Sequence, residues 1–163
     1  MSTILNTNGA EIDVPAILPQ VKKKFYVVTA DWNPAITHTL RKGALEVLRK
    51  GGVPEENIKS KRVSGTVELI NAAGVILNRK DAAAVIIIGC VIRGDTPHFD
   101  YVCEIAAHGT AALNARGEAA VIFGVLTVDN LKQAEERAGG ALGNKGAEAA
   151  VAAIEMANLP YLL

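Results

Sequence analysis

The residues best suited to catalysis lie within one short stretch, Gly94-Asp95-Thr96-Pro97-His98-Phe99-Asp100-Tyr101. Histidine exchanges protons near neutral pH, so His98 is a candidate proton carrier. Thr96 is predicted to be the N-cap of a helix whose first residue is Pro97, because threonine caps well and proline has no N–H to leave unpaired there. The free N–H groups of such a helix end attract phosphate. The stretch therefore combines a proton carrier with an anion site.

The alternative interpretation is a capped helix that carries a surface histidine, and an isolated Thr-Pro-His predicts no more than that. The element in front of it favours a site. Residues 82–88 form a short apolar run, rich in β-branched residues and bounded by charge and glycine. Such a run is typical of a parallel strand covered on both faces. Ligands bind at the carboxyl ends of these strands, where the loop with His98 begins.

The whole chain alternates between strand and helix patterns. Strands are predicted at residues 25–30, 57–63, 82–88 and 119–125, the second of them charged as an edge strand would be. Helices are predicted at residues 34–50, 67–77, 97–114, 127–138 and 143–158. The first helix should begin with Asn33 as N-cap and Pro34 as first residue. This order predicts an α/β fold, namely a three-layer αβα sandwich with a four-stranded parallel sheet, of flavodoxin-like type.

Two helices carry burial patterns that the structure can test. The third predicted helix has residues spaced for burial on one face, and these are Val102, Cys103, Ala106, Thr110 and Leu113. The last helix carries a face of small residues, which are Ala147, Ala149, Ala150, Ala152 and Ala153. Small residues let helices approach closely but bury little area each, so this face is predicted to lie in an interface between copies of the chain.

Length and composition limit the classes of protein that the chain could be. With 163 residues we expect a single domain, residues 1–163. Residues 1–24 form an N-terminal arm with two prolines, which fits an edge strand on a neighbouring subunit. The formal net charge is zero, so neither nucleic acid nor an anionic membrane is expected as a partner. The sequence shows neither a membrane-spanning apolar run nor a signal peptide, so the cytoplasm is the expected location.

The two cysteines do not indicate a metal site or a disulfide. Cys90 and Cys103 fit no zinc spacing with the three histidines, and one pair of cysteines makes no disulfide framework. Both are expected to be reduced, and Cys103 is expected to be a small core residue.

The stretch Gly94 to Tyr101 resembles the signature of the 6,7-dimethyl-8-ribityllumazine synthase family. The resemblance covers roughly residues 25 to 159. Its further motifs are Ala30-Asp31-Trp32-Asn33, Gly65-Thr66-Val67-Glu68-Leu69, Phe123-Gly124-Val125-Leu126-Thr127, Glu136-Arg137-Ala138-Gly139 and Gly143-Asn144-Lys145-Gly146.

The resemblance implies an enzyme of riboflavin biosynthesis, a transferase without cofactor or metal. It would condense 5-amino-6-(D-ribitylamino)uracil with L-3,4-dihydroxy-2-butanone 4-phosphate to give 6,7-dimethyl-8-(1-D-ribityl)lumazine, phosphate and water. The nucleophile is the amine of the substrate, so holding two molecules together can supply much of the acceleration. The resemblance also implies a homo-oligomer, either a homopentamer or an icosahedral capsid of sixty subunits, with riboflavin synthase as a further partner.

The resemblance assigns a role to each candidate site residue. Trp32 would stack on the pyrimidine, His98 would transfer protons, and Asp95 and Thr96 would hold phosphate. Six residues match the pyrimidine and ribityl contacts, namely Thr66, Val67, Glu68, Cys90, Val91 and Ile92. Phe123 and Arg137 would reach the substrates from the adjacent subunit.

Lys145 is similar to a further site position of the family. Each assignment has a structural alternative. Trp32 could be a rim residue that covers the core, Glu68 a carboxylate that favours a helix N-terminus, and Arg137 an ordinary cation in the last turn of a helix.

Two departures from the family pattern affect the pyrimidine site. Ser64 stands where the family commonly has proline, and Val67 where it often has an aromatic residue. A dinucleotide-binding domain is excluded because Ala30-Asp31-Trp32-Asn33 replaces the glycine-rich turn after the first strand. A receiver domain is excluded because only Asp31 offers an acid there. The remaining alternative is a catalytically silent shell-forming or scaffold subunit with the same fold.

Overall fold

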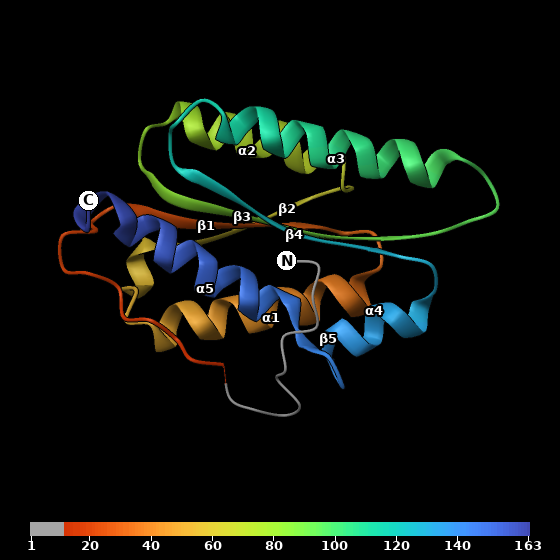
Figure 1. The fold of residues 1–163 in the computed structure, drawn as a ribbon, viewed down its shortest axis with the longest axis horizontal. Helices are drawn as coiled ribbons and strands as arrows, with labels where there is room; N and C mark the ends of the chain where they lie inside the picture. Colours follow the sequence, from red (N-terminus) through yellow and green to blue (C-terminus); the bar gives the residue numbers. More distant parts are fainter. Residues whose placement is uncertain (1–11) are drawn as a thin grey trace.

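A computed structural model describes residues 12–163 of the chain (Figure 1). Its centre is a four-stranded sheet in the order β2-β1-β3-β4, in which every pair is parallel. The strands are β1 (Lys24–Ala30), β2 (Ile58–Val63), β3 (Ala82–Ile92) and β4 (Ala120–Val128). The predicted parallel sheet is confirmed, with the charged strand β2 at one edge.

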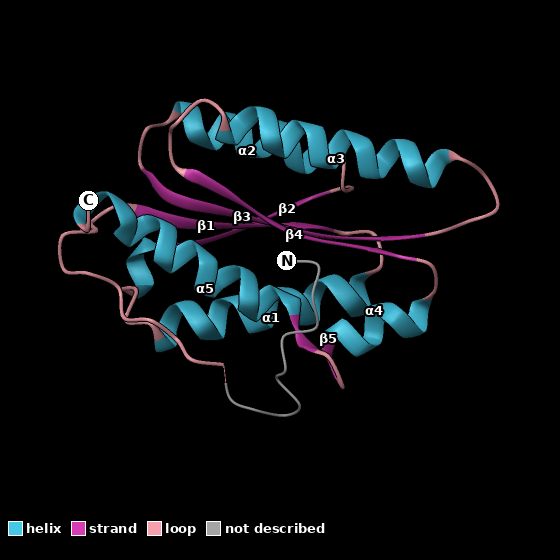
Figure 2. Cartoon of the chain, in the orientation of Figure 1, coloured by secondary structure: helices cyan, strands magenta, loops and turns pink. Residues whose placement is uncertain are grey.

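Helices cover both faces of this sheet, which makes the three-layer flavodoxin-like sandwich (Figure 2). One layer contains α1 (Pro34–Lys50), α4 (Leu131–Arg137) and α5 (Lys145–Asn158). The other contains α2 (Glu68–Asn78) and α3 (His98–Asn114). Short elements complete the chain, namely the 3-10 turns η1 (Glu55–Asn57) and η2 (Leu159–Tyr161) and the hairpin strands β5 (Ala138–Gly140) and β6 (Gly143–Asn144). Among residues 12–163, none of the helices combines the length and the apolar composition that a membrane span requires.

Strand β3 is longer than the sequence analysis predicted. It continues through Gly89 to Ile92, so Cys90, Val91 and Ile92 lie in a strand and not in a loop. Gly89 does not end the strand. A glycine stands there because Thr66 packs directly against its backbone. A Cβ there would lie 2.9 Å from Thr66 Oγ1, so only glycine lets the two segments approach this closely.

Strand β4 also extends further than predicted, and the helix after it begins later. Thr127 and Val128 belong to the strand, where Leu126 and Val128 continue the buried face. Helix α4 begins at Leu131, and Asn130 is its N-cap, accepting from Gln133 N at 3.0 Å. The predicted start at Thr127 is therefore wrong, because alternating burial, and not a capping signal, governs residues 126–128.

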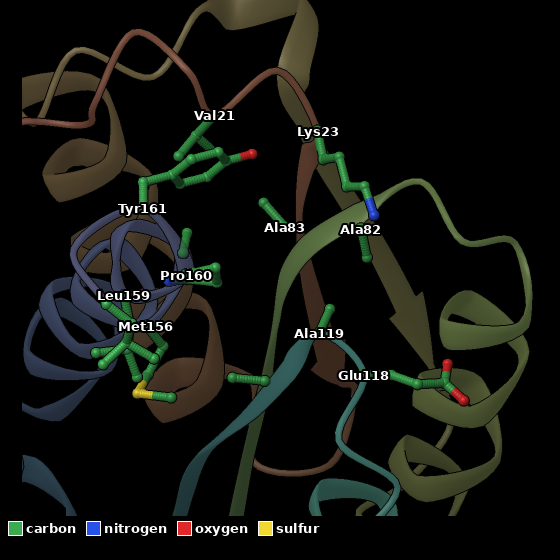
Figure 3. A pocket seen from close by; sticks show the side chains of 13 residues that line it. Val21, Lys23, Ala82, Ala83, Glu118, Ala119, Met156, Leu159, Pro160 and Tyr161 are labelled. Carbon is green, nitrogen blue, oxygen red and sulfur yellow. The ribbon is translucent and has the colours of Figure 1, made fainter.

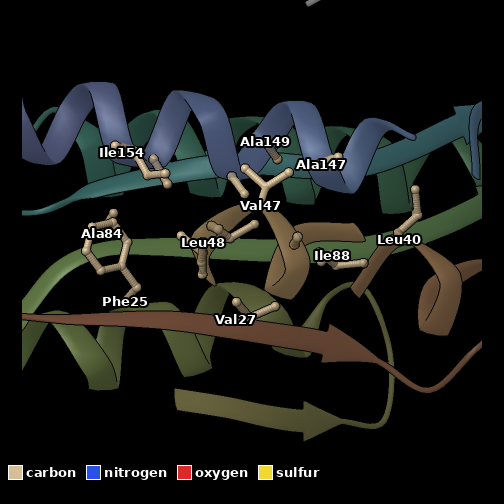
Figure 4. Close-up of a cluster of buried hydrophobic side chains, with 14 of the residues drawn as sticks. Phe25, Val27, Leu40, Val47, Leu48, Ala84, Ile88, Ala147, Ala149 and Ile154 are labelled. Atoms are coloured by element: carbon tan, nitrogen blue, oxygen red, sulfur yellow. The ribbon is translucent and has the colours of Figure 1, made fainter. Parts of the chain in front are cut away.

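The larger core lies between the sheet and the layer of α1 and α5 (Figure 4). Helix α1 turns one face toward this core, with Ile36, Leu40, Ala44, Val47 and Leu48 all buried. Four of the five alanines named for α5 are buried as well, which are Ala147, Ala149, Ala150 and Ala153. The prediction that this face lies in an interface between copies of the chain is therefore wrong. Its small side chains let α5 pack closely on α1 within one chain.

Helix α3 is much less buried than the sequence predicted. Of the five residues expected to be buried, only Ala106 and Thr110 are. Val102, Cys103 and Leu113 are partly exposed, so Cys103 is not a core residue. The reason is position, because α3 lies over β3 and the edge strand β4, and within residues 12–163 no further strand extends the sheet beneath it.

Residues 12–23 pack on their own chain. Asn158 fixes this segment with two hydrogen bonds, donating from Nδ2 to Ala16 O at 3.0 Å and accepting from Leu18 N at 2.9 Å. Ile12, Val14, Ile17 and Leu18 pack against the larger core. The predicted arm thus has a docked second half, while residues 1–11 lie outside the described part of the chain. Its contact with a neighbouring subunit stays a prediction.

Candidate active site

The candidate site lies where the strands end. Trp32 follows β1, Thr66 to Glu68 lead from β2 into α2, and Cys90 to Ile92 close β3. The loop with Asp95, Thr96 and His98 comes next. Because the strands are parallel and adjacent, their carboxyl ends share one edge of the sheet. The structure thus brings residues 32, 66–68 and 90–98 to one side of the molecule.

Trp32 and Glu68 both lie close to Gly65. A Cβ at Gly65 would lie 2.8 Å from Glu68 Oε2 and 3.4 Å from Trp32 Cδ1. The indole of Trp32 is 72% exposed, so it does not cover the core as a rim residue would. Glu68 is also the acidic residue in the first turn of α2, and it makes no side-chain cap. An open aromatic face therefore stands next to a carboxylate, which suits a flat, hydrogen-bonding ligand.

Asn33 connects the Trp32 loop to the end of β3. Its backbone is left-handed, with φ 56° and ψ 56°, and its side chain does not cap α1. Instead Asn33 Nδ2 donates to Cys90 O at 2.8 Å. The predicted start of α1 is confirmed, with Asn33 in the N-cap position and Pro34 as the first residue, but the Asn33 amide bonds to the neighbouring strand instead of capping the helix. The side chain of Asn33 therefore connects the loop that carries Trp32 to the end of β3 at Cys90.

The side chains at the end of β3 are packing residues. Cys90 is buried, and desolvation raises the pKa of its thiol to about 11. A thiol with so high a pKa is protonated at neutral pH and is a poor nucleophile. Thr66 is also buried, next to Gly89. Val91 and Ile92 are partly exposed. This part of the site can offer backbone groups and apolar contacts, but no reactive side chain.

The loop from Arg93 to His98 is exposed throughout. Helix α3 begins at His98, and Pro97 occupies the cap position without a side-chain cap. The prediction of Thr96 as N-cap and Pro97 as first residue is therefore wrong by one position. Pro97 O is the carbonyl that starts the first turn, accepting from Asp100 N at 2.9 Å. Asp95, Thr96 and His98 thus face solvent at the start of a seventeen-residue helix.

Phe123, Arg137 and Lys145 lie apart from this cluster. Phe123 is exposed on the edge strand β4, opposite Ile87 in the register. Arg137 Nη1 donates to Gln133 O at 3.0 Å, the contact expected of a cation in the last turn of a helix. Lys145 Nζ donates to the buried carboxylate of Glu148 at 2.8 and 3.0 Å. Within residues 12–163, no hydrogen bond or ion pair joins these three residues to the Trp32 cluster or to the loop of His98.

An apolar pocket of about 350 Å³ lies at the opposite, amino end of the sheet (Figure 3). Its walls come from Val21, from the start of β3 and from the chain end around Met156 and Tyr161. Glu118, at its side, is already paired with Lys80 at 2.9 Å and Arg116 at 2.8 Å. The pocket therefore presents little chemistry, and the candidate site is the open edge with Trp32 and His98.

Comparison with known proteins identifies the family of the chain. The family model described as 6,7-dimethyl-8-ribityllumazine synthase matches residues 22–161. Proteins named 6,7-dimethyl-8-ribityllumazine synthase are similar over nearly the whole chain. The one from Bacteroides fragilis is 50% identical over 86% of this chain and 98% of its own. The one from Parabacteroides distasonis is 47% identical over 93% of this chain and 94% of its own.

A third relative of the same name, from Porphyromonas gingivalis, is 51% identical over 82% of this chain and 83% of its own. The matched region contains every strand, every helix and every candidate site residue of the structure. The chain therefore belongs to the 6,7-dimethyl-8-ribityllumazine synthase family.

Proposed function

We propose that the chain is a lumazine synthase of riboflavin biosynthesis that uses the edge around Trp32 and His98 as its active site. It condenses 5-amino-6-(D-ribitylamino)uracil with L-3,4-dihydroxy-2-butanone 4-phosphate to give 6,7-dimethyl-8-(1-D-ribityl)lumazine. The observation that carries this proposal is the convergence of an open indole, a carboxylate and a histidine-bearing loop at one sheet edge. Packing requires none of the three.

The pyrimidine would bind on Trp32. Its indole face is open. Backbone groups of residues 90–92, at the end of the adjacent strand β3, would hydrogen-bond to the pyrimidine. Thr66, Val67 and Glu68 would contact the ring and the ribityl chain, with the Glu68 carboxylate accepting from its hydroxyls. The two departures from the family pattern, Ser64 and Val67, fall in this same segment. They affect the shape of the pyrimidine subsite and leave the loop of His98 untouched.

The phosphate and the proton transfers belong to the loop and to a neighbouring subunit. Asp95 and Thr96 would position the phosphorylated substrate, and His98 would carry protons while the amine attacks the ketone, water is lost, phosphate leaves and the second ring closes. Arg137 of the adjacent copy would bind the phosphate with a planar fork of N–H donors. Phe123 of that copy would contact the substrates, and Lys145 would act as a further site residue once its bond to Glu148 rearranges.

The proposal requires a homo-oligomer, because Phe123 and Arg137 do not reach the Trp32 cluster of their own chain. Exposed apolar residues on α3 and α4, which are Tyr101, Ile105 and Leu131, support a covered surface there. We propose that the single domain of residues 1–163 assembles as a homopentamer, with an icosahedral capsid of sixty subunits as its larger form. Cytoplasmic location and association with riboflavin synthase are part of the same proposal.

One assay tests the function against the alternative of a silent shell-forming subunit. The pure protein is mixed with both substrates, and formation of the fluorescent lumazine is followed. We expect turnover by the wild type, and no signal above the uncatalysed reaction would contradict the proposal. Arg137→Ala should then raise the KM for the butanone phosphate far more than the KM for the pyrimidine. Equal rises in both would remove Arg137 from the phosphate subsite.

Mixed assemblies test the shared site directly. Trp32→Ala removes the stacking surface of one half-site, and Arg137→Ala removes the phosphate ligand of the other. If the two halves come from different subunits, a mixture of the two variants rebuilds some intact sites. We expect the reassembled mixture, assayed at a low concentration of the butanone phosphate, to be more active than either parent. A mixture no more active than its parents would show that each site is built from one chain.

A further inference from the structure

The loop that carries the proposed anion and proton residues has no buried anchor of its own. Every residue from Arg93 to His98 is exposed. A Cβ built on Gly94 would meet nothing within 4 Å, so the backbone there stands clear of the rest of the protein. A loop without packing contacts samples many conformations unless specific bonds restrict it. The position of His98 therefore depends on the few bonds that tie this loop down.

Arg93 makes most of those bonds. Its backbone N donates to Val128 O at 2.9 Å, which fixes the start of the loop to the end of β4. Its side chain then spans two directions. Nε donates to Asp129 Oδ1 at 3.1 Å and Nη1 donates to Asp100 Oδ1 at 3.2 Å. The guanidinium carbon also lies 4.1 Å from the centre of the Phe99 ring.

We propose that Arg93 is a positioning residue that closes the catalytic loop and holds its two ends against β4. The inference deepens the proposed function and rests on it. Asp100 belongs to the first turn of α3, two residues after His98, while Arg93 is the first residue of the loop. One side chain thus joins the entrance of the loop to its exit. The same side chain joins both to Asp129, which follows the last residue of the neighbouring strand.

Arg93 acts on the loop and not on the substrate. Two of its nitrogens are committed to carboxylates, and these two negative charges offset its positive charge. Phosphate binding would need that charge free, so the guanidinium is not an anion ligand in this arrangement. Its planar fork is what allows two carboxylates and a ring to be contacted at once. A lysine has a single ammonium centre and cannot reproduce this geometry.

The expected effect is large on the reaction and small on folding. Both ion pairs are close to half exposed, and such pairs contribute little to the free energy of unfolding. Catalysis is more sensitive, because a displacement of about 1 Å at the reacting groups can cost ~10²-fold in rate. Loss of Arg93 should therefore separate activity from stability, which a residue of purely structural importance would not do.

The experiment compares three variants in the assembled protein. Arg93→Ala should lower kcat about 10-fold and raise the KM for the butanone phosphate about 10-fold, with the KM for the pyrimidine changed less than about 2-fold. Arg93→Lys should lie between Arg93→Ala and wild type. The matched control is Arg116→Ala, since Arg116 also donates to a carboxylate and a second side chain, Glu118 and Asn78, but at the other end of the sheet. It should leave all three constants unchanged.

Inorganic phosphate gives a readout independent of turnover. As an inhibitor that competes with the butanone phosphate, it should bind Arg93→Ala several-fold more weakly than wild type and Arg116→Ala with unchanged affinity. If Arg93→Ala keeps wild-type kinetic constants and phosphate inhibition, the positioning role is wrong. If the wild type itself makes no lumazine, the proposed function fails instead, so the two failures are distinguishable.

A double-mutant cycle locates the contact that matters. Asp129→Ala removes one acceptor of the guanidinium and should raise the KM for the butanone phosphate about 3-fold. The double variant with Arg93→Ala should be no worse than Arg93→Ala alone, because Asp129 acts only through Arg93. If the two effects on KM multiply in the double variant, Asp129 acts independently of Arg93. That result would overturn the proposed positioning role of Arg93.

Discussion

Helices α3 and α5 cover the same pair of strands from opposite faces, yet they differ sharply in burial. Nine of the fourteen residues of α5 are buried, but only two of the seventeen residues of α3 are. Helix α5 achieves this with alanines and glycine, whereas α3 leaves Tyr101 and Ile105 in solvent. Small residues thus produce the closely packed layer, and large apolar residues mark the open one.

The difference separates stability from function. Helix α5 lies on the larger core and is fixed there by α1, while α3 starts at His98 and carries the proposed chemistry. We therefore expect changes in the buried residues of α5 to act on the free energy of unfolding and changes in α3 to act on assembly and rate. Four predictions can break or sharpen this division.

The largest effect is expected at Gly146, in the first turn of α5. A Cβ at this position would lie 2.0 Å from Leu40 O in α1, a contact that no side chain can relieve by rotating. Gly146→Ala should therefore lower the free energy of unfolding by ~3 kcal/mol, measured by urea denaturation. Gly74→Ala in α2 is the control, since its Cβ would be 3.7 Å from Leu113 Cδ2. It should be neutral or stabilise by about 0.5 kcal/mol through helix propensity.

An unchanged urea midpoint for Gly146→Ala would show that α5 can shift away from α1 at little cost. The close packing of the α5 layer would then not be what holds the fold.

The next largest effect concerns the open layer. Ile105 is 47% exposed on α3, and in the proposed assembly this surface is covered by a neighbouring copy. Ile105→Asp would place a carboxylate in that interface. The free-energy cost of burying an unpaired charge exceeds the gain from burying an apolar side chain. We expect light scattering to report a smaller mass and lumazine formation to be lost, while the monomer stays folded by circular dichroism. Leu162→Asp, at an exposed site near the chain end, should keep both mass and activity.

If Ile105→Asp assembles like the wild type, the exposed residues of α3 are not at the interface. The surface that completes the site would then have to be sought elsewhere, starting from Phe123 and Leu131.

A smaller effect is expected at the first residue of α3. His98→Ala removes a proton carrier, whose contribution is commonly ~10²-fold in rate, while the reactivity of the substrate amine and the positioning of both substrates survive. The free energy of unfolding should change by less than about 0.5 kcal/mol, because His98 is exposed. Single-turnover kinetics with saturating substrates measures the chemical step. A rate equal to wild type would assign the proton transfer to another group.

The sequence predicted those parts of the fold that a periodic pattern determines. The four strands and their parallel arrangement follow from apolar runs such as residues 82–88 and from the alternation of strand and helix patterns. The buried face of α1 follows from the helical spacing of Ile36, Leu40 and Ala44. The boundaries at Ile92 and Val128 were missed because apolar strand patterns continue past glycine and threonine. The burial of α5 within its own chain was missed because alanine occurs on both buried and exposed helix faces. Whether these alanines are buried depends on how closely α1 approaches.

The site shows the same division between local and distant information. Trp32, Glu68 and His98 could be placed on one edge because each follows a predicted strand. Asn33 and Arg93 could not, since their bonds join residues far apart in sequence, 57 positions for Asn33 to Cys90 and 36 for Arg93 to Asp129. A cation at the start of an exposed loop that also contains acids is the one local signal that could have drawn attention to Arg93.

The smallest predicted effect lies at the amino end of the sheet, between the two helix layers. The ammonium of Lys24, at 2.9 Å, with the Tyr26 hydroxyl and Arg79, lowers the pKa of Asp81 to about 2. The pKa of an unfolded aspartate is ~3.9, so the carboxylate contributes stability above that pH and loses it as the pH falls toward 2. The loss should be about 1 kcal/mol, because the pair is partly exposed. Urea denaturation between pH 5 and pH 2 measures it, with Asp81→Asn expected to flatten that part of the pH profile. Since Lys24 and Asp81 join the two central strands and touch neither α3 nor α5, His98→Ala should show the same low-pH loss as wild type, and a different loss would mean that the open layer also sets the stability of the sheet.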